Sequence, residues 1–243
     1  MTVFNLEIII PYGDQTITLN PSIIKDAEEL LLVDCGYGGS LPLIAEQLAT
    51  HGLKADDLTG IIISHDDIDH IGGLFEIKTA YPALKIYSSQ IEAPYLSGEL
   101  KSLRLEQAES LFRSVPDEQK GWAIDFVNSL NSIKRTPIDS TFSFDFHFSD
   151  KMRIINTPGH TPGHISIYFP EEKTLIANDA IVVENGELEI ANPQFALDLD
   201  EAVRSVGKIS TLDIDRLICY HGGIVTDKIP QKLKRLIARY NKL

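Results

Sequence analysis

The feature that most constrains this chain is a charged block at residues 64–73, SHDDIDHIGG, which directly follows the apolar run at residues 58–63. The end of that run, Gly60-Ile61-Ile62-Ile63, is typical of a strand buried in a layered α/β core. The six residues from His65 to His70 hold two histidines and three aspartates. Adjacent carboxylates repel one another, and uncompensated charge near a core is costly. A bound divalent cation would remove that cost, so we ask whether the chain supplies further ligands.

The spacing inside the block favours a metal site. In an extended loop, residues two apart point to the same side, so His65, Asp67 and Asp69 can converge. His70 projects differently and can serve a neighbouring site. Imidazole and carboxylate are suitable ligands for zinc, iron, manganese or cobalt. Taken alone, the block is also compatible with an exposed acidic loop.

Three later segments favour the metal site over the exposed loop. Two prolines and two glycines at residues 158–163 fix a tight loop around His160, and such rigidity suits a ligand. Asp179 follows the apolar residues 175–177, and His221 follows Leu217-Ile218 and precedes two glycines. Each candidate therefore comes after a predicted strand, where an α/β sheet presents its ligands.

Alternating short strands and helices predict a layered α/β fold. Strands are expected at residues 7–10, 15–19, 22–25, 30–34, 60–64, 85–88 and 216–219. Helices are expected at residues 41–51, 199–210 and 231–241, and a further helical segment follows the charged block and ends at about residue 81. Residues from about 91 to 138 instead carry apolar side chains at helical spacing. This segment is expected to be a helical insertion. It could serve as extra cover for the core or as a cap that lines a substrate pocket.

Composition limits the partners of the chain. The 243 residues carry a net charge of −13, so nucleic acid is a poor partner for this polyanion. The two cysteines, Cys35 and Cys219, each end an apolar run and are expected to be buried thiols. The N-terminus lacks the pattern of a secretory signal, and no apolar run is long enough to span a membrane. We therefore expect a cytoplasmic protein with no membrane partner.

The order of these motifs resembles the metallo-β-lactamase superfamily, and the resemblance covers nearly the whole chain. The family's markers are an acid after an early strand, a His-x-His-x-Asp-His block, a later histidine, an aspartate and a final histidine. Here they are matched by Asp34, the charged block, His160, Asp179 and His221. The resemblance implies a four-layer αβ/βα sandwich with metals at one edge of its two sheets. It favours a single domain over residues 1–243, with the helical cap inserted at about 91–138.

The resemblance also implies a ligand set with one departure from the family pattern. It assigns His65, residue 67 and His160 to a first site, and Asp69, His70 and His221 to a second, with Asp179 bridging. Asp34 would orient a ligand without binding metal. Asp67 stands where most members have histidine, and its extra charge favours iron or manganese relative to zinc. We expect two divalent ions, zinc first among the candidates and iron or manganese as alternatives, although loss of the first site would leave one.

The family chemistry implies a metal-dependent hydrolase. A hydroxide bound between the ions would attack a small ester, lactone or thioester, as in the lactonase and glyoxalase II-like branches, and Asp69 would orient the nucleophile. The expected partner is thus a small-molecule substrate. Two alternatives stay open. The flavodiiron branch also carries a carboxylate at the position of Asp67, which suggests a di-iron redox protein. The other alternative is a catalytically silent metal-binding sensor on the same scaffold.

Overall fold

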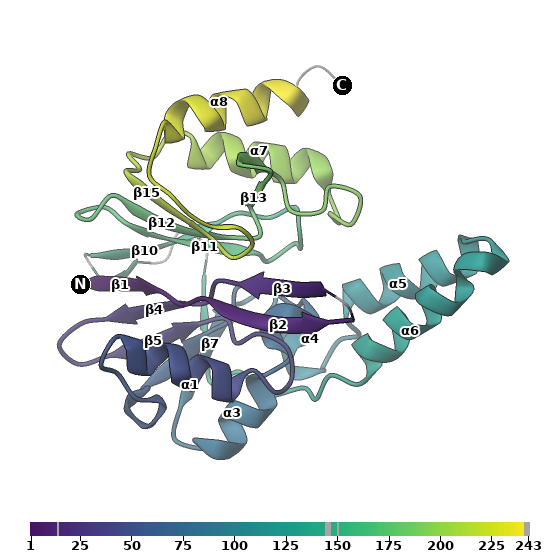
Figure 1. The fold of residues 1–243 in the computed structure, drawn as a ribbon, viewed down its shortest axis with the longest axis horizontal. Coiled ribbons are helices and arrows are strands. Elements are labelled where there is room, and N and C mark those ends of the chain that lie inside the picture. Colours follow the sequence, from purple (N-terminus) through teal and green to yellow (C-terminus); the bar gives the residue numbers. More distant parts are fainter. Residues whose placement is uncertain (14, 144–146, 150, 241–243) are drawn as a thin grey trace.

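The computed structural model describes residues 1–13, 15–143, 147–149 and 151–240. Figure 1 shows two β-sheets stacked face to face, with helices on the outer side of each. The first sheet has six strands in the order β1-β4-β5-β6-β7-β8. Its strands are β1 (Thr2–Asn5), β4 (Ser22–Lys25), β5 (Leu30–Val33), β6 (Gly60–Ile62), β7 (Lys85–Ser89) and β8 (Ser140–Phe142). Strands β5 to β8 run parallel, so their carboxyl ends meet at one edge.

The second sheet also has six strands, in the order β16-β15-β12-β11-β10-β9. Its strands are β9 (His147–Ser149), β10 (Met152–Asn156), β11 (Ile165–Phe169), β12 (Thr174–Asn178), β15 (Arg216–Cys219) and β16 (Gly223–Val225). Only β12 and β15 pair in parallel among the described neighbours. Two hairpins complete the strands: β2 (Ile8–Tyr12) with β3 (Gln15–Leu19), and β13 (Val182–Glu184) with β14 (Glu187–Glu189).

The layers follow from strands that are apolar on both faces. All four residues of β5 are buried. Leu30 and Leu32 join the core beneath helices α1 (Leu41–Thr50) and α3 (Leu74–Ala80). Leu31 and Val33 point the other way and join the core between the two sheets. This alternation with a period of two lets one short strand serve two cores.

The outer face of the second sheet is covered by α7 (Leu199–Ile209) and α8 (Ile229–Tyr240) (Figure 1). Val206 of α7 and Leu233 of α8 share one core with Leu175 and Leu217 of the sheet. The order helix, sheet, sheet, helix confirms the predicted four-layer αβ/βα sandwich.

Two predicted strands end earlier than expected, for a reason that matters to the site. The strands expected at 30–34 and 60–64 end at Val33 and Ile62. Asp34 has a φ of +58°, which turns the chain out of the sheet. Its carboxylate then accepts a hydrogen bond of 2.8 Å from the Ser64 backbone N–H. The side chain of Asp34 thus takes the place of backbone hydrogen bonding between the strands at the point where the charged block begins.

The charged block is not the extended loop expected, because its second half forms the helix α2 (Ile68–Ile71), which takes Asp69 out of the ligand group of His65 and Asp67. The helical segment predicted after the block is α3, so two short helices follow one another here. They are separated by Gly72 and Gly73. A Cβ at Gly73 would lie 2.4 Å from the carbonyl oxygen of Cys35, so only glycine fits this close approach. The two glycines thus let the block pack against the loop that follows β5.

The helical insertion lies between β7 and β8, at the predicted place. Its helices are α4 (Ala93–Ser97), α5 (Leu103–Ser114) and α6 (Lys120–Asn131); short 3₁₀ turns occur here at Asp117–Gln119 and elsewhere at Ala55–Asp57. Figure 1 shows α5 and α6 as a pair that projects beyond the sandwich. The pair has a small core of Ala108, Val127 and Leu130, against which Ile68 of α2 packs. We call residues 91–138 the cap, because this contact places it beside the charged block.

Candidate metal centre

All the predicted metal ligands come together at the edge of the two sheets. Those of the charged block follow β6, and three more follow β10, β12 and β15 of the second sheet: His160, Asp179 and His221. Their ligand atoms form overlapping groups in which every atom lies within 4.8 Å of the others. The first triad is His65, Asp67 and His160, and the second triad is Asp69, His70 and His221. A further group joins His65, His70 and Asp179 across the two triads.

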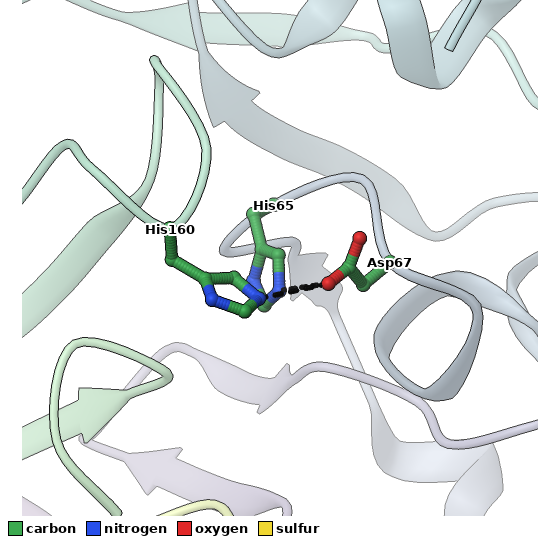
Figure 2. A group of neighbouring side chains, drawn as sticks. All are labelled: His65, Asp67 and His160. Atoms are coloured by element: carbon green, nitrogen blue, oxygen red, sulfur yellow. Dashed lines mark hydrogen bonds and ion pairs between the residues drawn. The ribbon is translucent and has the colours of Figure 1, made fainter. Parts of the chain in front are cut away.

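The first triad converges on one carboxylate oxygen, as Figure 2 shows. Asp67 Oδ2 lies 2.8 Å from His160 Nε2 and 3.4 Å from His65 Nε2. His65 and Asp67 come from the same loop, whereas His160 reaches in from the opposite sheet. The two sheets must therefore be stacked before this triad exists.

The second triad lies beside the first, and Asp179 reaches both. His221 Nε2 lies 3.1 Å from Asp69 Oδ2, and His70 Nε2 lies 3.8 Å from the same oxygen. Asp179 Oδ1 faces the second triad, 3.4 Å from His70 Nε2 and 3.5 Å from His221 Nε2. Its Oδ2 faces the first triad, 3.6 Å from His160 Nε2. This is the position that a bridging carboxylate requires.

Unpartnered buried atoms show that the centre fits divalent metal ions. His65 Nε2, His70 Nε2 and Asp179 Oδ1 are buried and have no hydrogen-bond partner among the described residues. Burying polar atoms without partners is costly, and these three residues form one of the groups whose ligand atoms lie within 4.8 Å of one another. Imidazole nitrogen and carboxylate oxygen are the donors that zinc, iron and manganese accept. Coordination of a metal would satisfy all three orphaned atoms.

Asp34 and Ser64 set the orientation of the buried imidazoles. Asp34 Oδ2 accepts a hydrogen bond from His70 Nδ1 at 2.7 Å. Ser64 Oγ donates to the same carboxylate at 2.6 Å, so its own lone pair accepts from His65 Nδ1 at 2.9 Å. With both Nδ1 atoms protonated, both Nε2 lone pairs face the centre, as ligation requires. Asp34 lies outside the ligand groups, at the place where the sequence predicted an orienting residue.

Sequence reasoning missed Arg104, a buried residue of α5 that is only 4% exposed. Its Nε donates to Asp67 Oδ1 at 2.7 Å and its Nη2 donates to Asp67 Oδ2 at 2.8 Å. Burial alone would raise the pKa of Asp67, but Arg104, the hydrogen bond from His160 and the nearby imidazole of His65 hold it well below its usual value. In the sequence, Arg104 is visible as an arginine within an apolar helical pattern. Sequence alone does not connect it to Asp67 of the charged block, which lies 37 positions earlier.

A second missed residue, Glu92, joins the two loops that carry the first triad. Glu92 is 1% exposed, and burial raises its pKa to about 7 against three hydrogen bonds that favour the charged form. It accepts from Asp66 N at 3.1 Å, in the loop of the charged block. It also accepts from Thr161 Oγ1 at 2.6 Å and Gly163 N at 2.8 Å, in the loop of His160.

The centre forms one wall of a cavity of about 440 Å³. Both triads contribute to its lining, as do Arg104 and Asp179. Apart from Tyr37, Glu184 and Asn192, the rest of the lining is apolar, and the cap supplies three of these apolar side chains, Trp122, Phe126 and Leu130. Of the two expectations for the insertion, this arrangement favours a cap that lines a pocket.

In the described part of the chain, no helix is long and apolar enough to cross a membrane.

Comparison with curated proteins finds relatives among metal-dependent hydrolases. The chain is 26% identical over 217 residues to the probable metallo-hydrolase YflN of Bacillus subtilis (strain 168), covering 84% of this chain and 79% of the relative. It is 24% identical over 138 residues to a hydroxyacylglutathione hydrolase of Synechococcus sp. (strain JA-2-3B'a(2-13)). That match covers 57% of this chain and 39% of the relative.

Solved structures share the fold. The metallo-beta-lactamase family protein TTHA1429 from Thermus thermophilus superimposes with a TM-score of 0.72 at 22% identity, covering 99% of this chain and 79% of that one. The dizinc quorum-quenching lactonase AidC, solved with a product, gives a TM-score of 0.60 at 20% identity and covers 86% of this chain and 75% of its own.

The family model of the metallo-beta-lactamase superfamily matches residues 19–221, a span that runs from the end of β3 to the last predicted ligand, His221. With the fold and the metallo-hydrolase relatives, this match shows that the chain belongs to the metallo-beta-lactamase superfamily and is a metallo-hydrolase.

Proposed function

We propose that this protein hydrolyses a small ester, lactone or thioester with an apolar acyl group. The observation that carries the proposal is the position of the metal-capable cluster at the wall of an apolar cavity. A substrate whose acyl chain lies against Trp122, Phe126 and Phe195 would present its carbonyl to the two triads. The cap supplies two of these three aromatic rings.

The proposed centre holds two divalent ions, with zinc as the first candidate. The first triad would hold one ion and the second triad the other, and Asp179 would contact both. Such ions, when bound, lower the pKa of a coordinated water to about 7 and polarise an acyl oxygen. The chain's own residues then have two tasks, to position the reacting groups and to move a proton.

Asp69 is the proposed catalytic residue. Its carboxylate lines the cavity and lies 3.1 Å from His221. From this position it would orient the attacking water and accept its proton at the carboxylate. Tyr220 supports this placement, because its hydroxyl donates at 2.6 Å to the backbone oxygen of Asp69. The backbone of Asp69 is thereby tied to the end of β15, which precedes His221.

Two further observations support a small-molecule substrate. The relatives include a hydroxyacylglutathione hydrolase, and a lactonase shares the fold. The net charge of −13 disfavours a nucleic-acid partner.

We also propose a cytoplasmic location, since Cys35 and Cys219 are free, buried thiols that suit a reducing compartment.

A hydrolysis screen tests the proposal. Protein stripped of metal and reloaded separately with zinc, manganese or iron is offered lactones, thioesters, simple esters and phosphodiesters. We expect turnover of one or more acyl classes that disappears with a chelator and in an Asp69→Asn variant. Absence of metal-dependent turnover in every class would overturn the proposal. Oxygen consumption with a reductant, in place of hydrolysis, would instead support the di-iron alternative.

A further inference from the structure

Arg104 places a guanidinium directly on the first triad. Besides its two hydrogen bonds to Asp67, its Nη2 lies 3.1 Å from His160 Nε2. Its Nη1 is held by the Gln107 side chain at 2.6 Å and by the backbone oxygen of Phe195. The guanidinium is therefore fixed by the cap on one side and contacts the triad on the other.

Arg104 and a metal ion cannot bind the same atoms of the first triad at the same time. Arginine can only donate, so its Nε and Nη2 occupy lone pairs on both oxygens of the Asp67 carboxylate. His160 Nε2 in turn donates its hydrogen to Asp67 Oδ2. These two atoms lie 2.8 Å apart. A metal in the first triad needs lone pairs on these same two atoms, one of which is engaged by Arg104 while the other carries a hydrogen. Only His65 Nε2, the third ligand atom, is left without a partner.

The second triad has no such competitor. Among the described residues, no lysine or arginine nitrogen lies within 4.0 Å of the carboxylate oxygens of Asp69 or Asp179. Their ion-pair contacts are with histidines, each of which can present a neutral ligand nitrogen. The two triads thus offer similar donor atoms under different electrostatic conditions.

We propose that Arg104 is an internal competitor for the metal of the first triad, so that the two metal positions differ in affinity. The second triad fills first. The first triad fills only when Nη2 of the guanidinium gives up Asp67 Oδ2, while the hydrogen bond from its Nε to Oδ1 can persist. One charge-assisted hydrogen bond is displaced in that exchange, which corresponds to a gap of about 100-fold between the two affinities. This inference rests on the proposed two-metal centre but not on the identity of the substrate.

Zinc titration of the metal-free protein, with a chromophoric chelator as competitor, tests the proposal. The wild type should take up one zinc tightly and a second about 100-fold more weakly. Arg104→Met keeps the length of the side chain without its charge and should bring the two affinities within about tenfold. Two equally tight steps in the wild type would overturn the proposal.

Arg135→Met is the matched control. Arg135 pairs with Asp66, the neighbour of Asp67, so this variant removes the same charge close by without touching a ligand atom. It should change the weak step by no more than about fivefold. Equal effects of the two variants would show that general charge controls the affinity, and would contradict competition by Arg104.

Two further experiments assign the steps and guard against misfolding. His160→Ala should remove the weak step and His221→Ala the tight one; the reverse assignment would overturn the proposal. Because Arg104→Met leaves a buried carboxylate unpaired, the double variant Asp67→His/Arg104→Met serves as a second test, with circular dichroism to check folding. It should bind two zinc ions within about tenfold of each other. A persistent 100-fold gap would sink the idea, whereas a correct zinc pattern without turnover would fault only the proposed hydrolysis.

Discussion

The two triads of the metal centre are held by different parts of the molecule. In the second triad, His70 is oriented by Asp34, which belongs to the turn after β5, and Tyr220 stacks on His70 with ring centroids 4.0 Å apart. Both supports come from the two sheets. In the first triad, Asp67 is held by Arg104 of the cap. The side chains that orient the second triad therefore come from the sandwich, although Ile68 of α2 also packs on the cap, whereas Asp67 of the first triad is held by the insertion.

This difference changes the meaning of the carboxylate at position 67. By itself, Asp67 adds a negative charge and favours iron or manganese over zinc. Paired with Arg104, it forms a unit with no net charge, as a neutral imidazole has. The extra charge is thus compensated within the protein, and position 67 no longer favours the harder metals by charge alone. Only the charge argument for the di-iron alternative is weakened by this pairing; the carboxylate oxygen at position 67 remains.

The largest effect is expected from Asp179, the residue that both triads share. Asp179→Asn removes a charge that faces His70 and His221 through Oδ1 and His160 through Oδ2. We expect both zinc steps to weaken by more than the roughly 100-fold that loss of an outer partner causes, and turnover to fall with them. Metal content by mass spectrometry measures this, with the exposed Asp227→Asn as control. Retention of one full-strength step would show that Asp179 serves only one triad.

A selective effect is expected from Asp34. Asp34→Asn tolerates the left-handed backbone at φ +58° but places an amide where the carboxylate accepts from His70 and Ser64. The tight zinc step should weaken by about 10- to 100-fold. The weak step should change less, because Asp34 reaches His65 only through Ser64. Equal weakening of the two steps in a titration would contradict the separate support of the triads.

The sequence could place the candidate ligands together because most of them follow closely on a strand, whereas Asp69 and His70 lie in α2. The period of apolar residues locates β6, β12 and β15, and parallel strands bring their carboxyl ends to one edge. His65, Asp179 and His221 could therefore be placed together without knowing the loops. The expected strand ends at Asp34 and Ser64 were too long by one or two residues, since a side chain there replaces the backbone ladder.

Arg104 and Glu92 could not be predicted in the same way, because their roles depend on how separate segments pack. The apolar spacing of α5 identifies a helix, but its rotation over the block decides whether Arg104 meets solvent or Asp67. Glu92 precedes α4, and its partners Thr161 and Gly163 lie about 70 positions later. No local pattern marks such a contact. The sequence does not show how the cap packs against the sandwich, and both roles depend on that packing.

Glu92 allows a test confined to the loops of the first triad. Its pKa rises from 4.5 in the unfolded chain to about 7 in the fold, so unfolding releases a proton between these values. Stability should therefore fall as the pH rises through this window, by about 3 kcal/mol in total. Glu92→Gln has no titrating group and should lack this component. Urea denaturation of the metal-free proteins at about pH 5 and about pH 7.5 measures the difference; parallel pH profiles would contradict it.

The smallest effect is expected where the cap contacts substrate rather than metal. Trp122 stacks on Phe126 at 5.8 Å and lines the cavity, yet remains 51% exposed. Trp122→Ala should raise KM for long acyl chains by less than about tenfold, because a half-exposed ring adds only part of the burial energy of a core residue. Short acyl substrates and both zinc steps should be unaffected. Ile124→Ala is the control, since Ile124 lies on the same helix outside the cavity lining. A change in zinc affinity with Trp122→Ala would mean that the cap acts as one rigid unit, in which the substrate wall and the Arg104 contact cannot be separated.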